Sequence, residues 1–190
     1  LPTAAVSART GDLRARSLAG AAFIDWFTGD AASALELANE SLGGELGWAG
    51  SLMCYVRAMA LIHLGRVDEL ETRALPERLP ASVGPIDRLA VSGTVHLYLD
   101  DLEAAATDLA AAVDLGRNAT SSQLFAMALS ILAEVELRRG RWDAAMIDAE
   151  LAVAFATDVS GVHACIQAHT VAVEAAAGRG RFDDARAHLD

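Results

Sequence analysis

The chain contains no lysine, and this absence excludes several classes of function. All 15 of its basic side chains, histidine aside, are arginines. A P-loop cannot be present, because that motif uses a lysine to reach the nucleotide phosphates. Schiff-base catalysis and the ATP-binding lysine of kinases are excluded for the same reason. These residues therefore carry no lysine-dependent chemistry of their own.

Aromatic residues, prolines and cysteines are also scarce. Aromatics make up 5% of the 190 residues, and there are four prolines and two cysteines. Cys54 and Cys165 lie far apart and outside any CxxC spacing, which favours buried, reduced thiols and a cytoplasmic protein. The N-terminal residues lack a hydrophobic signal core, and no apolar run reaches the ~18 residues of a membrane span. We therefore expect no membrane segment.

Alanine and acidic residues, by contrast, are abundant. The chain has 41 alanines, and hydrophobic residues total 53%. Alanine has the highest helix propensity, and the alternating patterns typical of strands are almost absent, so the sequence predicts an all-α fold. The formal net charge is −11. Because an acidic surface repels phosphate backbones, we expect these residues to make no direct contact with nucleic acid.

A short phrase recurs along the chain at nearly regular intervals. In each copy a Gly or Asp is followed, two residues later, by an apolar residue: Ala31, Val67, Leu102, Trp142 or Phe182. The intervals between these apolar residues are 36, 35, 40 and 40 residues. An apolar helix is expected before each of them, over residues 13–27, 52–64, 86–99, 123–138 and 162–177. A repeat of this length is typical of an array of helical hairpins.

Each hairpin is expected to turn at its Gly or Asp. Glycine can end a helix in the left-handed conformation, and the apolar residue after it fills the corner between the two helices. Asp100 and Glu103 have the spacing of a capping box. One hairpin cannot bury its apolar face alone, so the hairpins must stack. The sequence predicts a right-handed α-solenoid of antiparallel helix hairpins, with about four and a half repeats over residues 1–190 as one domain and an irregular loop at 74–88.

These units resemble the tetratricopeptide repeat (TPR). Small residues stand where that family has its two small residues on the second helix, with Ala105, Ala145 and Ala185 at the first place and Ala112 and Ala152 at the second. Gly93 matches the glycine of the first helix. The tyrosine expected in the first helix is replaced by His96 and Glu136, and no proline closes a unit. The array is therefore TPR-like and degenerate.

The resemblance to the TPR also implies a groove that binds a partner. In that family the contacting residues lie on the first helix of each hairpin, at fixed positions before the first small residue of the second helix. Carried over to this sequence, the candidate groove residues are Tyr55, Met59, Thr94, Ser130, Glu134, Thr170 and Glu174. Most of them are small or acidic, so the expected partner is a basic or neutral peptide.

A narrower resemblance covers most of the chain. Phrases such as LYLDDLEAAATDLAAAVDLGR and VEAAAGRGRFDDARAHL are similar to the middle region of large bacterial LuxR-family transcriptional regulators. In that family an ATPase domain precedes the helical array and a helix-turn-helix domain follows it. The resemblance implies a piece of a longer protein, in which the array couples an effector, a partner or another domain of its parent to DNA binding elsewhere. The alternative is a free-standing TPR-like adaptor that binds a peptide in its concave groove.

No pattern in the sequence predicts catalysis or a cofactor. There is no GxSxG nucleophile elbow, and the acids are scattered along helix faces, which also disfavours an all-helical toroid enzyme. Cys165 and His169 share a face of one predicted helix with His163 nearby, but a third ligand is missing, so we expect no metal site. Truncated helical arrays expose apolar end faces. We therefore expect self-association through a terminal hairpin, for example as a homodimer.

Overall fold

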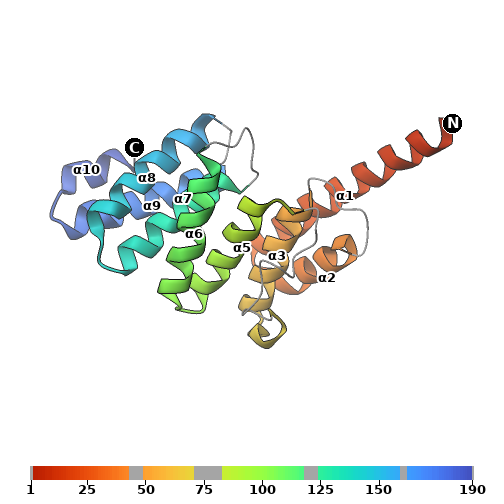
Figure 1. Cartoon of the computed structure of the whole chain (residues 1–190), viewed down its shortest axis with the longest axis horizontal. Coiled ribbons are helices and arrows are strands. Elements are labelled where there is room, and N and C mark those ends of the chain that lie inside the picture. Colours follow the sequence, from red (N-terminus) through yellow and green to blue (C-terminus); the bar gives the residue numbers. More distant parts are fainter. Residues whose placement is uncertain (1, 43–48, 71–82, 118–123, 159–161, 190) are drawn as a thin grey trace. The chain divides into compact units, whose positions relative to one another are not determined.

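The computed structural model describes residues 2–42, 49–70, 83–117, 124–158 and 162–189. Nearly all of these residues are helical, and there is no strand among them, so the predicted all-α class is confirmed (Figure 1). None of the helices in these ranges combines the length and the apolar character that crossing a bilayer requires.

The first helix of every predicted hairpin is present. These helices are α1 (Pro2–Thr28), α3 (Ala49–His63), α5 (Pro85–Tyr98), α7 (Phe125–Arg138) and α9 (Val162–Gly178). Each ends within one residue of its predicted end, whereas α1 begins well before the predicted start at residue 13. Helix ends were predictable because the repeated Gly or Asp stops each helix at the same place.

The second element of every hairpin begins at the residue that marks the repeat. These elements are α2 (Ala31–Leu42), η1 (Val67–Leu70), α6 (Leu102–Gly116), α8 (Trp142–Asp158) and α10 (Phe182–Ala187). In the second hairpin the described part, η1, is a short 3₁₀ helix. Most of the predicted loop at 74–88 lies outside the described residues. Its end was predicted wrongly, because Pro85 begins α5, where its missing N–H has no helical partner to lose.

One backbone conformation is shared by all five hairpin turns. The turn residues Gly29, Gly65, Asp100, Gly140 and Gly180 have φ between 62° and 94°. In each turn the next amide donates to the carbonyl five residues earlier, as Arg141 N does to Glu136 O at 2.8 Å. This is the Schellman motif, which gives partners to the last carbonyls of a helix. The repeated phrase therefore encodes the helix stop.

The capping box predicted at Asp100 was wrong. Asp100 takes the left-handed turn position, with φ of 62°. Asp101 is the N-cap of α6, and its carboxylate accepts a hydrogen bond from the Ala104 amide at 3.2 Å. Glu103 binds Arg139, the residue that follows α7, at 2.8 Å. Two adjacent aspartates follow α5, and the first replaces glycine because aspartate tolerates positive φ better than most residues do.

The described helices fall into two compact units, Leu1–Val91 and Ser92–Asp190, and the division lies within α5. In the first unit, α1 packs on both α2 and α3, and α2 packs on α3. In the second unit, α7 packs on α6, α8 and α9, α8 packs on α9, and α9 packs on α10. Contact with both the next helix and the one after it is the packing of stacked TPR-like hairpins. That one domain and one right-handed superhelix span all repeats stays a prediction.

Alanines make the contacts between helices in the second unit. Its core cluster contains Ala133, Ala145, Ala149, Ala172 and Ala175, all fully buried. The small residues of the TPR resemblance are at most 6% exposed, namely Ala105, Ala112, Ala145, Ala152 and Ala185. Gly93 also fits its predicted place, because a Cβ there would meet the side chain of Leu109 on α6. Small side chains thus let adjacent helices approach closely.

Candidate functional site

Four of the seven candidate groove residues lie in the interior. Tyr55 and Met59 in α3, Thr94 in α5 and Ser130 in α7 are at most 2% exposed. The Tyr55 ring lies edge-on to the indole of Trp26, with centroids 5.5 Å apart. The Ser130 hydroxyl donates to a carbonyl of its own helix. In this arrangement the four side chains contribute to packing and do not offer a surface to a partner.

The burial of α7 explains why Ser130 does not line a groove. It was chosen by counting a fixed number of positions back from the small residue of the second helix, a method called position counting below. Three helices, α6, α8 and α9, pack on α7. Residues 124–133 are all buried, and Glu134 is the first side chain with partial exposure. Most of α7 therefore has no exposed side chains that could line a groove for a partner. The open surface begins near the C-terminal end of this helix.

The other three candidates are accessible. Glu134 is partly exposed, whereas Thr170 and Glu174 on α9 are exposed. One carboxylate oxygen of Glu134 accepts a hydrogen bond from Arg138, and the other accepts one from Gln167 of α9 at 2.7 Å. This side chain therefore links α7 to α9 on the open side of both helices.

Tyr98, at the end of α5, completes a polar strip with Glu134, Arg138 and Gln167. Burial raises the pKa of Tyr98, the charge of Glu134 raises it further, and Arg138 lowers it. The phenol therefore stays neutral at physiological pH and can donate a hydrogen bond. Position counting found only Glu134 of this polar strip. The i, i+4 spacing of Glu134 and Arg138 was the available signal for Arg138, whereas no local pattern points to Tyr98 or Gln167.

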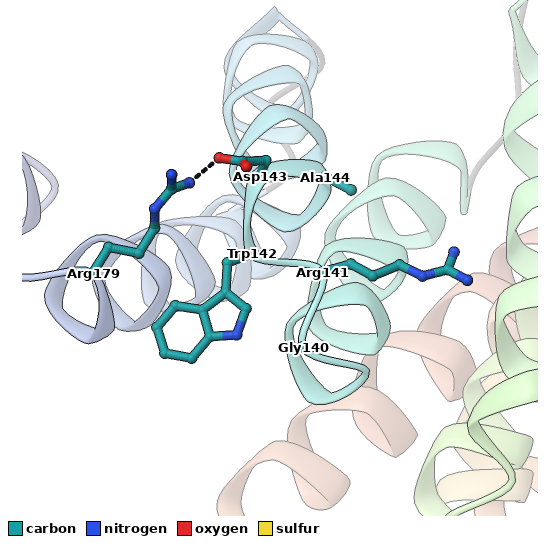
Figure 2. Close-up of a pocket in the computed structure, with 6 residues that line it drawn as sticks. All are labelled: Gly140, Arg141, Trp142, Asp143, Ala144 and Arg179. Atoms are coloured by element: carbon teal, nitrogen blue, oxygen red, sulfur yellow. Dashed lines mark hydrogen bonds and ion pairs between the residues drawn. The ribbon is translucent and has the colours of Figure 1, made fainter.

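The contact between the last two hairpins is centred on Trp142 (Figure 2). A Cβ at Gly178 of α9 would overlap the Trp142 ring, so the indole needs a glycine there. Beside it, the Arg179 guanidinium binds the Asp143 carboxylate, the pair joined by the dashed line in Figure 2. The same ion pair occurs one repeat earlier between Arg139 and Glu103, at 2.8 Å. Figure 2 shows the hollow that these residues border, which is lined by Gly140, Arg141, Trp142, Asp143, Ala144 and Arg179. Its Trp142, Asp143 and Arg179 thus join successive hairpins.

A buried carboxylate lies close to this contact. Glu136 is 7% exposed, and its carboxylate binds Arg139 at 2.8 Å and Arg141 at 3.4 Å. Burial raises the pKa of Asp148, and the nearby charge of Glu136 raises it further. Two guanidinium groups balance Glu136, so this cluster has a structural role in holding the turn between α7 and α8.

A hollow of about 390 Å³ lies between α9 and the end of α10. It is lined by Cys165, Ile166, His169, Thr170, Val173, Glu174, His188 and Leu189. Two of the candidate groove residues, Thr170 and Glu174, are therefore brought together with exposed apolar side chains. We call this feature the α9–α10 hollow.

The residues considered as metal ligands form no complete site. His169 Nδ1 lies 3.2 Å from His188 Nδ1, and Cys165 lines the same hollow while packing on the cluster of Ala126, Ala156 and Ala164. Burial lowers the pKa of His163. Within the described part of the chain, no three His, Cys, Asp or Glu residues are grouped so that they could hold a metal ion. A hydrogen bond between the two imidazoles accounts for their separation.

Comparison with known families finds a match in the second unit. Residues 126–146 and 166–190 match the family described as the tetratricopeptide repeat. Each stretch runs from a first helix, through Gly140 or Gly180 in the left-handed conformation, into the second helix. No curated protein and no solved structure matches the chain. Over these stretches the chain is similar to the TPR, in agreement with the stacking of α7, α8, α9 and α10.

Proposed function

We propose that residues 1–190 are a non-catalytic, TPR-like interaction domain that binds a protein or peptide partner in the cytoplasm, within a LuxR-family transcriptional regulator. The interaction role rests on one observation: hairpins that match the TPR stack so that accessible polar side chains lie on the open side of α7 and α9. Proteins built from such repeats generally act as scaffolds for other proteins. The regulator context rests on the sequence phrases alone.

The polar strip and the neighbouring residues of α9 suggest the chemistry of the partner. Glu134 and Glu174 place carboxylates on this side, and the whole chain carries a formal charge of −11. Tyr98 is 45% exposed, and its aromatic ring offers a surface against which an arginine or lysine side chain can pack. A peptide with basic residues fits this surface better than an acidic one does. Binding there would bias the stacking of the hairpins and so affect a flanking domain.

A peptide array tests the interaction role. Immobilised basic, neutral and acidic peptides are probed with the purified chain and with the double variant Tyr98→Ala/Glu134→Gln. We expect basic peptides to retain at least tenfold more wild-type protein than acidic ones, and the double variant to lose most of this binding. Glu150→Gln, a matched change on the exposed side of α8, should bind like the wild type. Equal retention on all peptides, or no effect of the double variant, would contradict the proposal.

The regulator context has a separate test. Sequencing the gene on both sides of the codons for residues 1–190 should reveal a P-loop ATPase before them and a helix-turn-helix domain after them. If neither is present, the regulator assignment fails and the peptide-binding adaptor remains. The array experiment is unaffected by this outcome, so the two parts of the proposal are tested independently.

A further inference from the structure

Two large apolar side chains lie on the solvent side of α8. Ile147 is 65% exposed and Leu151 is 44% exposed, and the exposed Ala154 follows them. Because an α-helix turns once in about 3.6 residues, these three residues share one side of the helix. The opposite side carries the buried residues that pack on α7 and α9, among them Ala145 and Ala149. We call Ile147, Leu151 and Ala154 the α8 ridge.

The side of α8 that carries the ridge is left open by the packing of the hairpins. Forty residues earlier, in α6, the equivalent residues are Thr107, Ala111 and Asp114. Thr107 and Asp114 are exposed, although α7, α8, α9 and α10 follow α6 in the same unit. Later hairpins therefore leave this side of a second helix uncovered, and the ridge is a surface of the array itself.

The fold does not require large apolar side chains at these places. Aligning the left-handed glycines before α2 and α8 pairs Ile147 with Glu36 and Leu151 with Glu40, and both glutamates are exposed. In α6 the two places hold a threonine and an alanine. All three helices are second helices of their hairpins, and α8 alone among them has two large apolar residues there. Exposed apolar side chains that packing does not need point to contact with another molecule.

Carboxylates border the α8 ridge on both margins. Glu150 is exposed on one margin and makes no ion pair with any residue that the structure describes. Asp148 lies on the other margin, where burial raises its pKa and the nearby charge of Arg117 lowers it. The Arg117 guanidinium also lies 3.5 Å from the Asp114 carboxylate. Carboxylates thus outnumber guanidinium groups around the ridge, and a positively charged partner fits it better than a negatively charged one.

We propose that the α8 ridge binds an amphipathic helix of a partner protein, whose apolar residues pack on Ile147 and Leu151 and whose arginines or lysines face the carboxylates. Ile147 and Leu151 are four residues apart, and a row of side chains at this spacing packs into a groove of another helix. The backbone of α8 is hydrogen-bonded within the helix, so the ridge offers no partners to the backbone of an extended peptide. A helical partner needs none, because it satisfies its own amides and carbonyls.

The same charges disfavour two other occupants. A second copy of this chain, docked ridge to ridge, would bring carboxylates against carboxylates, which repel each other. Anionic lipid head groups would be repelled in the same way. The ridge is also separate from the polar strip, which lies on the first helices of the hairpins and is formed by Tyr98, Glu134, Arg138 and Gln167. Binding at the ridge therefore does not depend on peptide binding at the polar strip.

A synthetic amphipathic peptide tests the proposal. It has about 18 residues, with leucines on one side of the helix and arginines among glutamines on the other. All measurements use chains that carry Tyr98→Ala/Glu134→Gln, here called the strip-free protein, so that the polar strip does not contribute. A failure of the proposed function thus leaves this test unaffected. Fluorescence anisotropy of the labelled peptide measures binding, and circular dichroism verifies that each protein is folded.

The decisive variant gives α8 the residues of α6. Adding Ile147→Thr/Leu151→Ala to the strip-free protein should weaken binding about tenfold or more, because two apolar contacts are lost. Leu13→Ala, a matched change at a 63% exposed leucine of the first unit, should leave binding unchanged. A peptide of the same composition in scrambled order has no apolar side, so it should bind far more weakly than the amphipathic peptide.

A second peptide, with glutamates in place of the arginines, tests the charge. The strip-free protein should bind it about tenfold more weakly than the arginine peptide, and Glu150→Arg should narrow this difference. Equal binding of the amphipathic and scrambled peptides, no binding of either, or no effect of Ile147→Thr/Leu151→Ala would each overturn the proposal. So would a dimer of the strip-free protein that this double change abolishes, because a second copy would then be the occupant. Sedimentation velocity without peptide detects such a dimer.

Discussion

The indole of Trp142 fills the space that a side chain at Gly178 would occupy. Gly116 and Phe125 form a similar pair, because a Cβ at Gly116 would overlap the Phe125 ring. In both pairs a large ring on one helix requires a residue without a side chain on its neighbour. The repeated phrase of the sequence therefore specifies two things, the turn within a hairpin and the contact with the next hairpin.

Replacing Gly178 by alanine should destabilise the second unit. The new Cβ would overlap the Trp142 ring, and overpacking of this kind costs about 1–3 kcal/mol. Gly20→Ala is the matched control, because no neighbour lies within 4 Å of a Cβ there. It should stabilise α1 by about 0.5–1 kcal/mol through helix propensity. Urea unfolding followed by circular dichroism measures both changes.

A rescue variant separates overpacking from other effects. Trp142→Leu removes the ring, so the double variant Gly178→Ala/Trp142→Leu should be destabilised by less than the sum of the two single changes. A Gly178→Ala protein as stable as the wild type would show that the indole can move away without cost. Strictly additive losses would show that the two residues do not act on each other.

Breaking the buried ion pair between Arg139 and Glu136 should lower the free energy of unfolding more than breaking an exposed pair does. The Glu136 carboxylate is nearly inaccessible, and Arg139 is its shorter contact, at 2.8 Å. Arg139→Met leaves this charge with the longer contact to Arg141, and we expect a loss of about 3 kcal/mol in the free energy of unfolding. Arg181→Met, which breaks a half-exposed pair with Asp184, should cost below about 1 kcal/mol.

The double variant Arg139→Met/Glu136→Gln gives the control for this effect. Removing the charge of Glu136 removes the need for a partner, so the double variant should recover much of the stability that Arg139→Met loses. If it is no more stable than Arg139→Met, the loss comes from packing of the arginine stem. Thermal unfolding of the wild type, Arg139→Met, Arg181→Met and the double variant in one buffer decides between an unpaired charge and lost packing as the cause.

The turns and helix ends were predictable from local sequence. Glycines at residues 29, 65, 140 and 180 stop their helices through the left-handed conformation, which depends on the residue itself. The apolar residue two places later begins the next element in every hairpin. Local chemistry decides such features, so one sequence is enough to find them. At the third turn, two aspartates compete for one place, and only the structure shows that Asp100 takes it.

The surface was less predictable, because burial depends on how several helices pack. Ser130 and Thr170 occupy the same position in successive repeats, yet Ser130 is fully buried and Thr170 is exposed. The difference is that α9 covers the hairpin of Ser130. Position counting within one repeat contains no information about the helix that comes next. For the same reason it missed Tyr98 and Arg138, whose roles depend on neighbours from other helices.

The two cysteines should differ in reactivity. Burial raises the pKa of Cys54 to about 11, although the charges of Arg57 and Arg88 lower it. Cys165 is only half buried, at the wall of the α9–α10 hollow. Because the thiolate is the reactive form, iodoacetamide at neutral pH should modify Cys165 in the folded protein and Cys54 only after unfolding. Mass spectrometry of tryptic peptides measures both rates.

Serine variants identify the reactive thiol. Cys165→Ser should abolish labelling of the folded protein, whereas Cys54→Ser should leave it unchanged. Equal rates for the two thiols under native conditions would contradict the burial of α3 on which the prediction depends. Addition of denaturant should make the rates converge, which verifies that the peptides are equally detectable.

His96 and His163 should give opposite contributions to stability as the pH changes. Interaction with Asp108 raises the pKa of His96, burial opposes this, and the charges of Asp108 and Asp101 raise it further. Its Nδ1 lies 3.2 Å from Asp108 Oδ2, and this contact with the carboxylate is the main cause of the raised pKa. Burial lowers the pKa of His163.

The signs follow from which state binds the proton more tightly. The folded protein holds the proton on His96 more tightly than the unfolded chain, whose histidine pKa is about 6.5. The stabilisation by His96 is therefore complete below that pH and is lost as the pH rises above it. For His163 the unfolded chain binds the proton more tightly. Its contribution is therefore complete above about pH 6.5 and is lost as the pH falls through the lower folded pKa.

Urea unfolding of the wild type and two variants, across the pH range around these pKa values, measures both effects. The stability difference between wild type and His96→Gln should shrink as the pH rises, because only the wild type loses the protonated His96. The difference between wild type and His163→Gln should grow as the pH rises, because only the wild type escapes the cost of charging a buried imidazole. Parallel pH profiles for all three proteins would show that neither histidine is coupled to folding. A reversed slope for His96→Gln would show that burial outweighs Asp108 there.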